Sequence, residues 1–154
     1  GNRDHRNVVT SLELDSAKME VNNLRFQATY RAIEENEVRF QEYYTDDAEY
    51  LIVAFGSVAR ICLKAIEDAR AAGVKIGMLR PITLWPFPTK EIARLSEKVK
   101  GILTVELNAG QMVEDVRLAV EGRVPVRHFG RMGGIVPNPG EVLEALAREF
   151  SVQL

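Results

Sequence analysis

The stretch Tyr50-Leu51-Ile52-Val53-Ala54-Phe55, followed by Gly56-Ser57, decides the fold class of this 154-residue chain. Six apolar residues in a row, stopped by a glycine, are typical of a strand that is buried on both faces. Residues 58–72 then repeat apolar side chains every three or four positions and predict a helix, capped by Ser57 and ended by Gly73. A buried strand that leads directly into a helix indicates a parallel sheet covered by helices.

The same alternation continues to the C-terminus. Strands are predicted at 74–79, 101–107 and 125–129, and helices at 89–99, at about 112–120 and after residue 138. Prolines at 81, 86 and 88 exclude regular structure between the second strand and its helix. The last helix has the clearest start, because Asn138 can cap it, Pro139 fits its first position and Glu141 can complete a capping box. We therefore expect an α/β three-layer sandwich, with a mainly parallel sheet and helices on both faces.

The residues before this pattern predict a helical arm. Residues 8–44 are highly charged and contain neither proline nor glycine. Their aromatic and aliphatic side chains at 26, 30, 33, 40 and 44 fall on one helical face, and Thr10 to Glu13 has the capping-box pattern. We expect one long or broken helix from about Ser11 to Tyr44. The organisation is thus a helical arm or linker at 1–47, attached to an upstream domain, and an α/β domain at 48–154; a chain that starts with glycine fits that reading.

Composition excludes several classes of function. The formal net charge is −2 with 46% hydrophobic residues, which gives no electrostatic basis for binding nucleic acid or an anionic membrane. No apolar run is long enough to span a membrane, and no signal peptide is visible. Cys62 is the only cysteine, so the chain forms no internal disulfide and cannot ligate an iron–sulfur cluster by itself. A reducing cytoplasm fits these features.

Ligands and partners of an open parallel sheet meet the loops at the carboxyl ends of its strands. The segment from Arg80 to Pro88 is the most unusual of these loops, because two prolines bracket an aromatic and the only tryptophan lies there. A stiff loop with tryptophan and arginine favours a buried interface over a substrate pocket, and packing of Trp85 into its own domain is the alternative. The interface candidates are Arg80, Trp85, Pro86, Phe87, Gln111 and Arg131.

The other strand-end loops offer weak anion sites. Gly56 and Ser57 begin a helix, where free N–H groups attract anions, but neither the dinucleotide-binding nor the P-loop glycine spacing is present. Arg131 lies in the glycine-rich segment 130–134, which could wrap an anion or could simply need positive φ angles. A tight turn is the competing interpretation at Gly56.

Reactive groups do not form a recognisable constellation. Glu106 ends a predicted strand without a second titratable group beside it, which favours a structural hydrogen-bonding role over acid–base catalysis. His5 and His128 are isolated, so no metal site is predicted, and Ser57 has no histidine at a nucleophile-elbow spacing. We predict no catalytic residue on this chain.

Four segments carry a family resemblance that extends over nearly the whole chain. Residues 51–60 (LIVAFGSVAR), 74–88 (VKIGMLRPITLWPFP), 105–115 (VELNAGQMVED) and 129–139 (FGRMGGIVPNP) closely resemble the α subunit of 2-ketoisovalerate ferredoxin oxidoreductases. The arm resembles the linker helix of the same subunit. The LWPFP and ELNAGQM stretches are specific to this family, whereas the strand-Gly-Ser-helix stretch is shared with transketolase C-terminal domains.

This resemblance implies a transketolase C-terminal-like domain within a multi-subunit enzyme. Proteins of this family oxidatively decarboxylate 2-oxoacids on thiamine diphosphate with Mg²⁺, pass electrons through [4Fe-4S] clusters to ferredoxin, and release an acyl-coenzyme A. The implied partners are an upstream pyrimidine-binding domain, β and iron–sulfur subunits, ferredoxin and a second copy in a homodimer. Asn22-Asn23 has no preceding Gly-Asp-Gly and sits in a predicted helix, so it is a chance match to a thiamine site.

These expectations make the chain a non-catalytic fragment of an oxidoreductase, which assembles and supports an active site formed elsewhere. One alternative is an anion- or coenzyme A-binding module of the same complex, using Gly56, Ser57 and Arg131. Others are the C-terminal domain of another transketolase-like enzyme, or a stand-alone regulatory domain, although the first strand ends without the acidic cluster that a receiver domain needs for Mg²⁺. The sequence alone does not select the 2-oxoacid.

Overall fold

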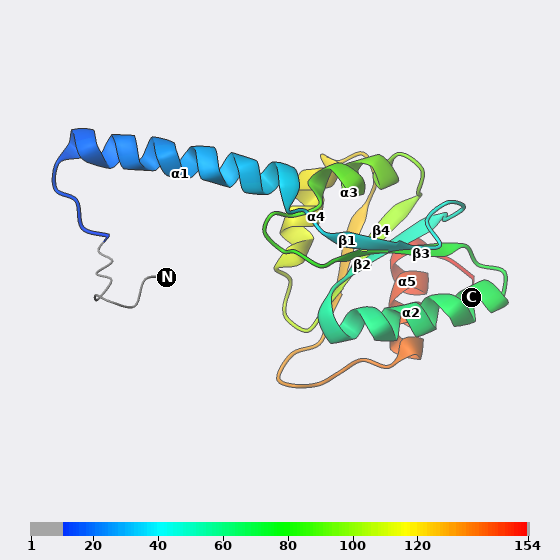
Figure 1. The fold of residues 1–154 in the computed structure, drawn as a ribbon. Helices are drawn as coiled ribbons and strands as arrows, with labels where there is room; N and C mark the ends of the chain where they lie inside the picture. The colour runs from blue at the N-terminus through cyan, green and yellow to red at the C-terminus, as the bar shows by residue number, and fades with distance from the viewer. Residues whose placement is uncertain (1–10, 154) are drawn as a thin grey trace, which may run out of the picture. The chain divides into compact units, whose positions relative to one another are not determined.

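The computed structural model describes residues 11–153, which divide after Asn36 into two compact units. The first unit contains helix α1 (Ser16–Asn36), and the second contains a five-stranded sheet with the remaining described helices (Figure 1). In chain order the second unit comprises β1 (Phe40–Tyr43), β2 (Tyr50–Ala54), α2 (Gly56–Ala71), β3 (Ile76–Pro81), α3 (Thr89–Ser96), β4 (Gly101–Glu106), α4 (Met112–Val120), β5 (Val126–Gly130) and α5 (Pro139–Phe150).

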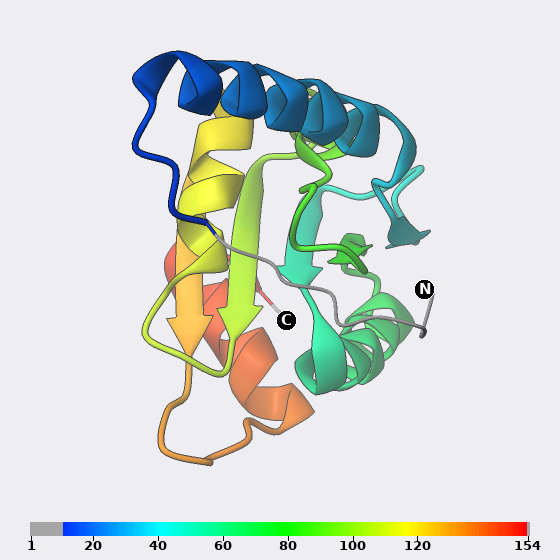
Figure 2. The same ribbon diagram turned by 60° about the vertical axis from the view of Figure 1, so that its left-hand side comes forward.

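The sheet has the strand order β1-β3-β2-β4-β5. Strands β2 to β5 are mutually parallel, and Figure 2 shows β2, β4 and β5 running in the same direction. Strand β1 pairs antiparallel with β3 and forms one edge. The expected α/β architecture with a mainly parallel sheet is confirmed.

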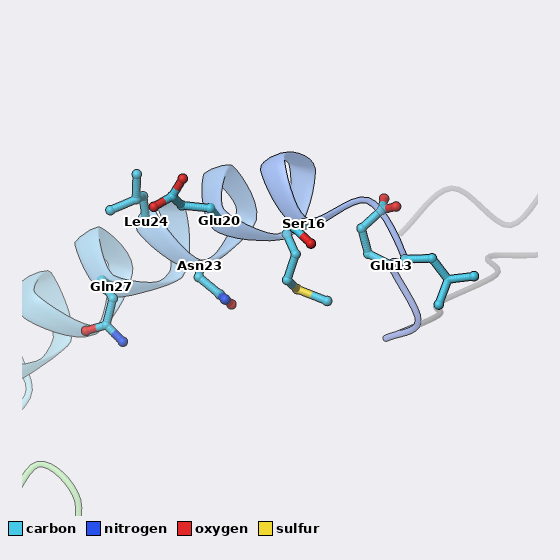
Figure 3. A pocket seen from close by; sticks show the side chains of 8 residues that line it. Glu13, Ser16, Glu20, Asn23, Leu24 and Gln27 are labelled. Carbon is cyan, nitrogen blue, oxygen red and sulfur yellow. The ribbon is translucent and has the colours of Figure 1, made fainter.

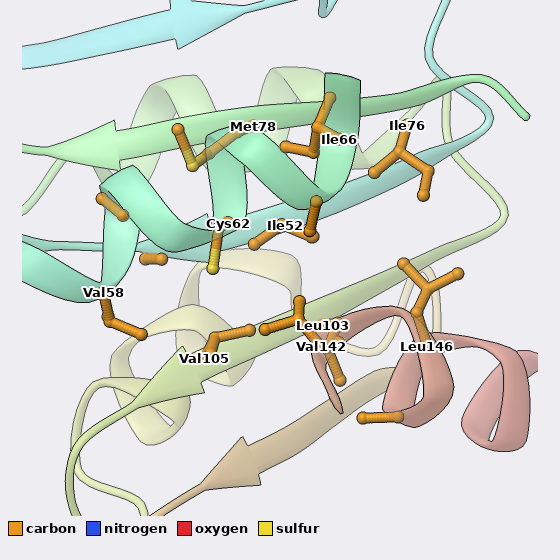
Figure 4. Close-up of a cluster of buried hydrophobic side chains, with 14 of the residues drawn as sticks. Ile52, Val58, Cys62, Ile66, Ile76, Met78, Leu103, Val105, Val142 and Leu146 are labelled. Atoms are coloured by element: carbon orange, nitrogen blue, oxygen red, sulfur yellow. The ribbon is translucent and has the colours of Figure 1, made fainter. Parts of the chain in front are cut away.

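Helices cover both faces of the sheet, as buried strands require. Helices α2 and α5 pack together on one face, and α3 and α4 pack together on the other (Figure 1). Side chains alternate along β2, so Ile52 and Ala54 join one core cluster while Leu51 and Val53 join the other. Figure 4 shows the first cluster, where Cys62 of α2 lies among aliphatic side chains of the strands and α5.

The predicted bounds of the long N-terminal helix are wrong at both ends. Helix α1 begins at Ser16, where the Asp15 carboxylate accepts hydrogen bonds from the backbone N–H groups of Ala17 (3.0 Å) and Lys18 (3.3 Å). It ends at Asn36, and Phe40–Tyr43 forms strand β1 instead. Pairing with β3 satisfies the backbone of this segment, which overrides its helical periodicity. Thr10, the cap that the sequence predicts, lies outside the described residues.

Two smaller predictions also need correction. Pro81 does not exclude regular structure, because it is the last residue of β3, where its missing N–H removes at most one ladder bond. Ser57 does not cap α2, since that helix already begins at Gly56 with Phe55 in the cap position and without a side-chain hydrogen bond. By contrast, the capping box of Asn138 and Glu141 at the start of α5 is confirmed. Within residues 11–153, no helix combines the length and apolar character needed to cross a bilayer.

Candidate functional site at the carboxyl edge of the sheet

The topology places four loops along one edge of the sheet. The chain leaves β2 through α2 to reach β3, then crosses back on the other face through α3 to β4. The loops after β2 and β4 therefore diverge over opposite faces, at the point where such sheets bind ligands or partners. Since β2 to β5 are parallel, the loops after β3 and β5 lie along the same edge. Strands β3 and β5 are three strand spacings apart, about 14 Å.

The loop after β3 turns some side chains inward and others outward. Phe87 packs against the core cluster on the α3 and α4 face, and Pro86 is buried. Trp85 is 55% exposed, and its neighbours Ile82 and Leu84 are also exposed. The loop is anchored to the residue before β1, because the N–H of Ile82 donates to the carbonyl of Arg39 at 2.9 Å. A fixed backbone thus presents three apolar side chains to solvent.

Arg80, at the end of β3, contacts the edge strand. Its guanidinium donates a hydrogen bond to Oε1 of Gln41 in β1 at 3.1 Å, and Tyr43 donates to the same oxygen at 2.8 Å. The Arg80 Nε atom is buried without a hydrogen-bond partner among the described residues. Arg80 therefore hydrogen-bonds within its own sheet. Its side chain is less available for contact with a partner than the exposed side chain of Trp85.

Glu106, the last residue of β4, organises the next loop. Its carboxylate is fully buried and accepts backbone hydrogen bonds from Gln111 (3.2 Å), Met112 (2.8 Å) and Val113 (3.1 Å). These N–H groups lie at the start of α4 and have no hydrogen-bond partner within the helix. The Glu106 carboxylate accepts their hydrogen bonds, and its negative charge interacts favourably with the helix dipole. The predicted structural role of Glu106 is confirmed.

His128 lies beside this carboxylate from the neighbouring strand, so the predictions that no titratable group adjoins Glu106 and that His128 is isolated are wrong. Its Nε2 atom is 3.6 Å from Oε1 of Glu106 and is buried without a hydrogen bond among the described residues. Gly130 makes room for the ring, because a Cβ there would overlap both the His128 ring and the backbone oxygen of Asn108. His128 is therefore a packing residue with one polar atom directed at a buried carboxylate, rather than an exposed base.

The loop after β5 presents apolar side chains and engages its arginine internally. Met132, Ile135 and Val136 are each more than half exposed. Arg131 donates to Oε1 of Glu141 at 2.7 Å, and Glu141 also belongs to the α5 capping box. Arg131 thus stabilises the start of α5 in this structure, which leaves less of its charge for an external anion.

The exposed apolar residues that follow the parallel strands along the carboxyl edge are here called the apolar rim. It consists of the exposed residues Ile82, Leu84, Trp85, Leu107, Met132, Ile135 and Val136. No group of three or more histidine, cysteine, aspartate or glutamate side chains suited to a metal ion occurs among the described residues. The sole cysteine, Cys62, is fully buried in the core, and burial raises its pKa to about 12.

A separate open hollow lies on the first unit, between the segment before α1 and the first turns of that helix (Figure 3). Glu13, Ser16, Glu20, Asn23, Leu24 and Gln27 are among its lining residues. These side chains are mostly exposed and bring together no pair of groups suited to acid–base or nucleophilic chemistry. The residues that line the hollow therefore offer no arrangement of reactive groups.

Comparison with known proteins assigns the chain to a family. Residues 48–142 match the family model for the pyruvate:ferredoxin oxidoreductase core domain II. The chain belongs to this family. It is also 45% identical over 147 residues to the ketoisovalerate oxidoreductase subunit VorB of Methanothermobacter thermautotrophicus, covering 95% of this chain and 42% of that subunit. The resemblance found in the sequence is confirmed, and the chain spans about two fifths of that relative's length.

Solved structures support the same fold for this core domain II member. A 2-oxoglutarate:ferredoxin oxidoreductase from Magnetococcus marinus aligns with a TM-score of 0.79 at 18% identity, covering 97% of this chain and 27% of that one. A split-gene transketolase aligns with a TM-score of 0.53 at 19% identity, covering 73% of this chain and 36% of that one. These alignments confirm the transketolase C-terminal-like fold.

The sequence identified some rim residues and missed others. The sequence singles out Trp85 because it is the only tryptophan and lies in a stiff, proline-containing loop, and the structure places it on the surface. Ile82, Leu84 and the apolar residues after β5 lie in strand-end loops that are predicted to form an interface, but the sequence does not single out these side chains or Leu107. Their only sequence signal is an aliphatic residue placed just after a predicted strand, which does not reveal whether the side chain turns inward or outward. Gln111 has an exposed side chain, but its backbone N–H donates a hydrogen bond to the Glu106 carboxylate.

Proposed function

We propose that this chain is the C-terminal domain of the α subunit of a 2-oxoacid:ferredoxin oxidoreductase of the 2-ketoisovalerate type, and that its apolar rim supports an active site built by other domains. Membership of the core domain II family supports the placement in such an enzyme. The observation that carries the supporting role is the apolar rim itself, where the edge expected to bind ligands exposes aliphatic and aromatic side chains.

In this proposal the whole complex oxidatively decarboxylates a 2-oxoacid and releases an acyl-coenzyme A while it reduces ferredoxin. Its other members are the upstream pyrimidine-binding domain, the β and iron–sulfur subunits, and a second copy of this subunit. Residues 1–47 would then form the linker from the upstream domain, and the complex would work in the cytoplasm. The identity to a ketoisovalerate oxidoreductase subunit supports this choice of substrate.

The described residues do not fit the Mg²⁺ ion or the iron–sulfur clusters of such a complex. Glu106, the only carboxylate that ends a parallel strand, is buried and already accepts three backbone hydrogen bonds, so it offers no oxygen to Mg²⁺. Cys62 is a buried core residue and cannot reach an iron–sulfur cluster. We therefore assign thiamine diphosphate, Mg²⁺, the clusters and coenzyme A to other parts of the complex, and no reaction step to this chain.

The supporting role can be tested with a charge placed in the rim. Trp85→Asp in the co-expressed complex should reduce both co-purification of the catalytic subunits and oxidation of 2-ketoisovalerate, because an interface anchor becomes a buried charge. Leu118→Asp is the matched control, since Leu118 is 75% exposed on α4, away from the rim. The urea midpoint of each isolated variant should stay close to that of the unmodified chain.

Two results would contradict the proposal. The complex with Trp85→Asp could assemble and turn over as well as the Leu118→Asp control, which would remove the rim from the interface. Alternatively, the isolated chain could bind thiamine diphosphate with micromolar affinity in a calorimeter, which a supporting domain without cofactor ligands should not do.

An anion-binding module is the second candidate. Helix α2 begins without a side-chain cap at the exposed residues Gly56 and Ser57, so its first N–H groups can meet an anion such as a coenzyme A phosphate. The ion pair between Arg131 and Glu141 weighs against it, as does the position of β4 between β2 and β5. Titration of the chain with coenzyme A and with inorganic phosphate distinguishes the two functions, because the supporting role predicts no binding.

A further inference from the structure

Arg39 and Thr83 fasten the loop after β3 to the segment of chain that leads into β1. The carbonyl of Arg39 accepts hydrogen bonds from the backbone N–H groups of Ile82 (2.9 Å) and Thr83 (3.1 Å). In return, the N–H of Arg39 donates to the hydroxyl oxygen of Thr83 at 3.0 Å. That hydroxyl also donates to the Arg39 carbonyl at 3.4 Å. This hydrogen-bonded arrangement of Arg39, Ile82 and Thr83 is here called the clasp.

The clasp continues the pairing of β1 with β3, but a side chain takes the place of a backbone acceptor. Phe40 lies opposite Pro81 in the antiparallel register, so Arg39 lies opposite Ile82. In a regular ladder, two residues opposed in this way exchange both backbone hydrogen bonds. Here the N–H of Arg39 donates to the Thr83 hydroxyl. The backbone after Ile82 can therefore turn away from the sheet while the Arg39 N–H keeps an acceptor.

The exposed end of the loop lies between the clasp and the core. Leu84 and Trp85 come directly after Thr83, and they are 48% and 55% exposed. The next residue, Pro86, is buried, and Phe87 packs against the core cluster on the α3 and α4 face. The short exposed segment is thus fixed at both ends, which leaves its backbone few conformations. Removal of one fixed end should give this segment more freedom.

We propose that Thr83 is a positioning residue for Trp85, and that its hydroxyl holds the loop in the conformation in which Trp85 meets its partner. This inference rests on the proposed supporting function of the apolar rim. A loop that leaves this conformation must be ordered again on binding, so the apparent affinity falls with the fraction of time that it spends elsewhere. Thr83 acts through Trp85 and does not have to contact the partner itself.

The fluorescence of Trp85 reports on the loop, because Trp85 is the only tryptophan of the chain. Thr83→Val keeps the branched shape of the side chain and removes the hydroxyl. In time-resolved anisotropy of the whole 154-residue chain, the amplitude of the nanosecond local motion of Trp85 should rise about twofold. Hydrogen exchange at the Arg39 N–H should accelerate about tenfold, since this donor loses its acceptor.

Two variants separate the hydroxyl from other effects of substitution. Thr83→Ser keeps the hydroxyl and should restore both the anisotropy decay and the exchange rate. Arg39→Ala should leave both unchanged, because the clasp uses the backbone of Arg39, whereas its guanidinium pairs with Glu37 at 2.8 Å. If Thr83→Val lowers the urea midpoint and leaves the anisotropy of Trp85 unchanged, Thr83 stabilises the fold and does not position Trp85.

The co-expressed complex shows whether the position of Trp85 matters for assembly. Thr83→Val should weaken association with the catalytic subunits about fivefold, and Thr83→Ser should restore it. If Thr83→Val loosens Trp85 without weakening an assembly that Trp85→Asp impairs, the positioning inference is wrong and the proposed function stands. If neither Thr83→Val nor Trp85→Asp impairs assembly, the proposed function fails and the inference fails with it.

Discussion

At the scale of single residues, Glu106 shows how a charged side chain becomes part of the core. It has no exposed surface, and its two carboxylate oxygens accept three backbone hydrogen bonds at the start of α4. A buried carboxylate is tolerated only when its charge is satisfied, and N–H groups at a helix start provide both donors and a favourable dipole. Glu106 therefore fixes the position of a carboxyl-edge loop.

Replacement of this carboxylate tests that role. Glu106→Gln should lower the free energy of unfolding by about 1–3 kcal/mol, because the amide nitrogen cannot accept a hydrogen bond and leaves a buried N–H group unsatisfied. Glu114→Gln in the first turn of α4 is the matched control, since Glu114 is exposed and its replacement should cost no more than about 0.5 kcal/mol. Urea titration provides both values. Equal losses in the two variants would contradict a special role for Glu106.

Cys62 gives a pH-dependent prediction. Burial raises its pKa from an ordinary value of 9.0 to about 12, so the unfolded thiol loses its proton at lower pH than the folded one. The folded state then binds more protons than the unfolded state between about pH 9 and 12, and stability falls as pH rises through that window, by up to about 1.4 kcal/mol per pH unit.

The loss of stability at high pH should be absent from a variant without the Cys62 thiol. Cys62→Ala costs stability at pH 8 through the cavity that it leaves, but the difference between the two proteins should shrink by about 1 kcal/mol at pH 10. Urea midpoints at the two pH values measure this change. A difference that stays constant with pH would show that the folded thiol titrates normally.

At the scale of elements, the start of β4 is set by its contact with the end of α5. Gly101 is buried, and a Cβ at this position would overlap the Phe150 ring. The same ring packs against Tyr50 at the start of β2, with 5.5 Å between ring centroids. One aromatic side chain of the last helix thus covers the beginnings of two neighbouring strands, which ties α5 to the centre of the sheet.

This contact predicts a coupled pair of substitutions. Gly101→Ala should destabilise the chain by about 1–3 kcal/mol, because the added methyl group displaces the Phe150 ring. Phe150→Leu removes the obstacle at its own cost, so adding Gly101→Ala to it should cost much less than adding it to the unmodified chain. A double-mutant cycle from urea titrations measures this coupling. Strict additivity would mean that the methyl group and the ring do not meet.

At the scale of the whole molecule, the α/β unit begins earlier than its first parallel strand. The division between the two units follows Asn36, so β1 belongs with the sheet. Glu42 of β1 forms an ion pair with Arg94 of α3, and Phe40 packs against the core cluster on that face. Without β1, the long edge of β3 would be open to pairing with other chains.

Two truncations test this boundary. A chain of residues 37–154 should keep the urea midpoint of the longer chain measured at low concentration, because no residue of α1 is buried. A chain of residues 48–154 should have a lower midpoint and should aggregate, since it loses β1 and exposes the β3 edge. Size-exclusion chromatography with light scattering measures the aggregation. Equal behaviour of the two truncated chains would show that β1 is dispensable.

The sequence by itself determined the α/β class, the buried strands, the capped start of α5 and the family. Each of these depends on local signals, such as a run of apolar residues or Asn138 with Pro139 and Glu141. Only the tertiary structure decided that Phe40–Tyr43 is a strand, that Glu106 starts α4, and that Ile82, Leu84 and Trp85 face outward. These outcomes depend on partners distant in the chain, because strand pairing, charge burial and side-chain direction are fixed by packing and not by periodicity.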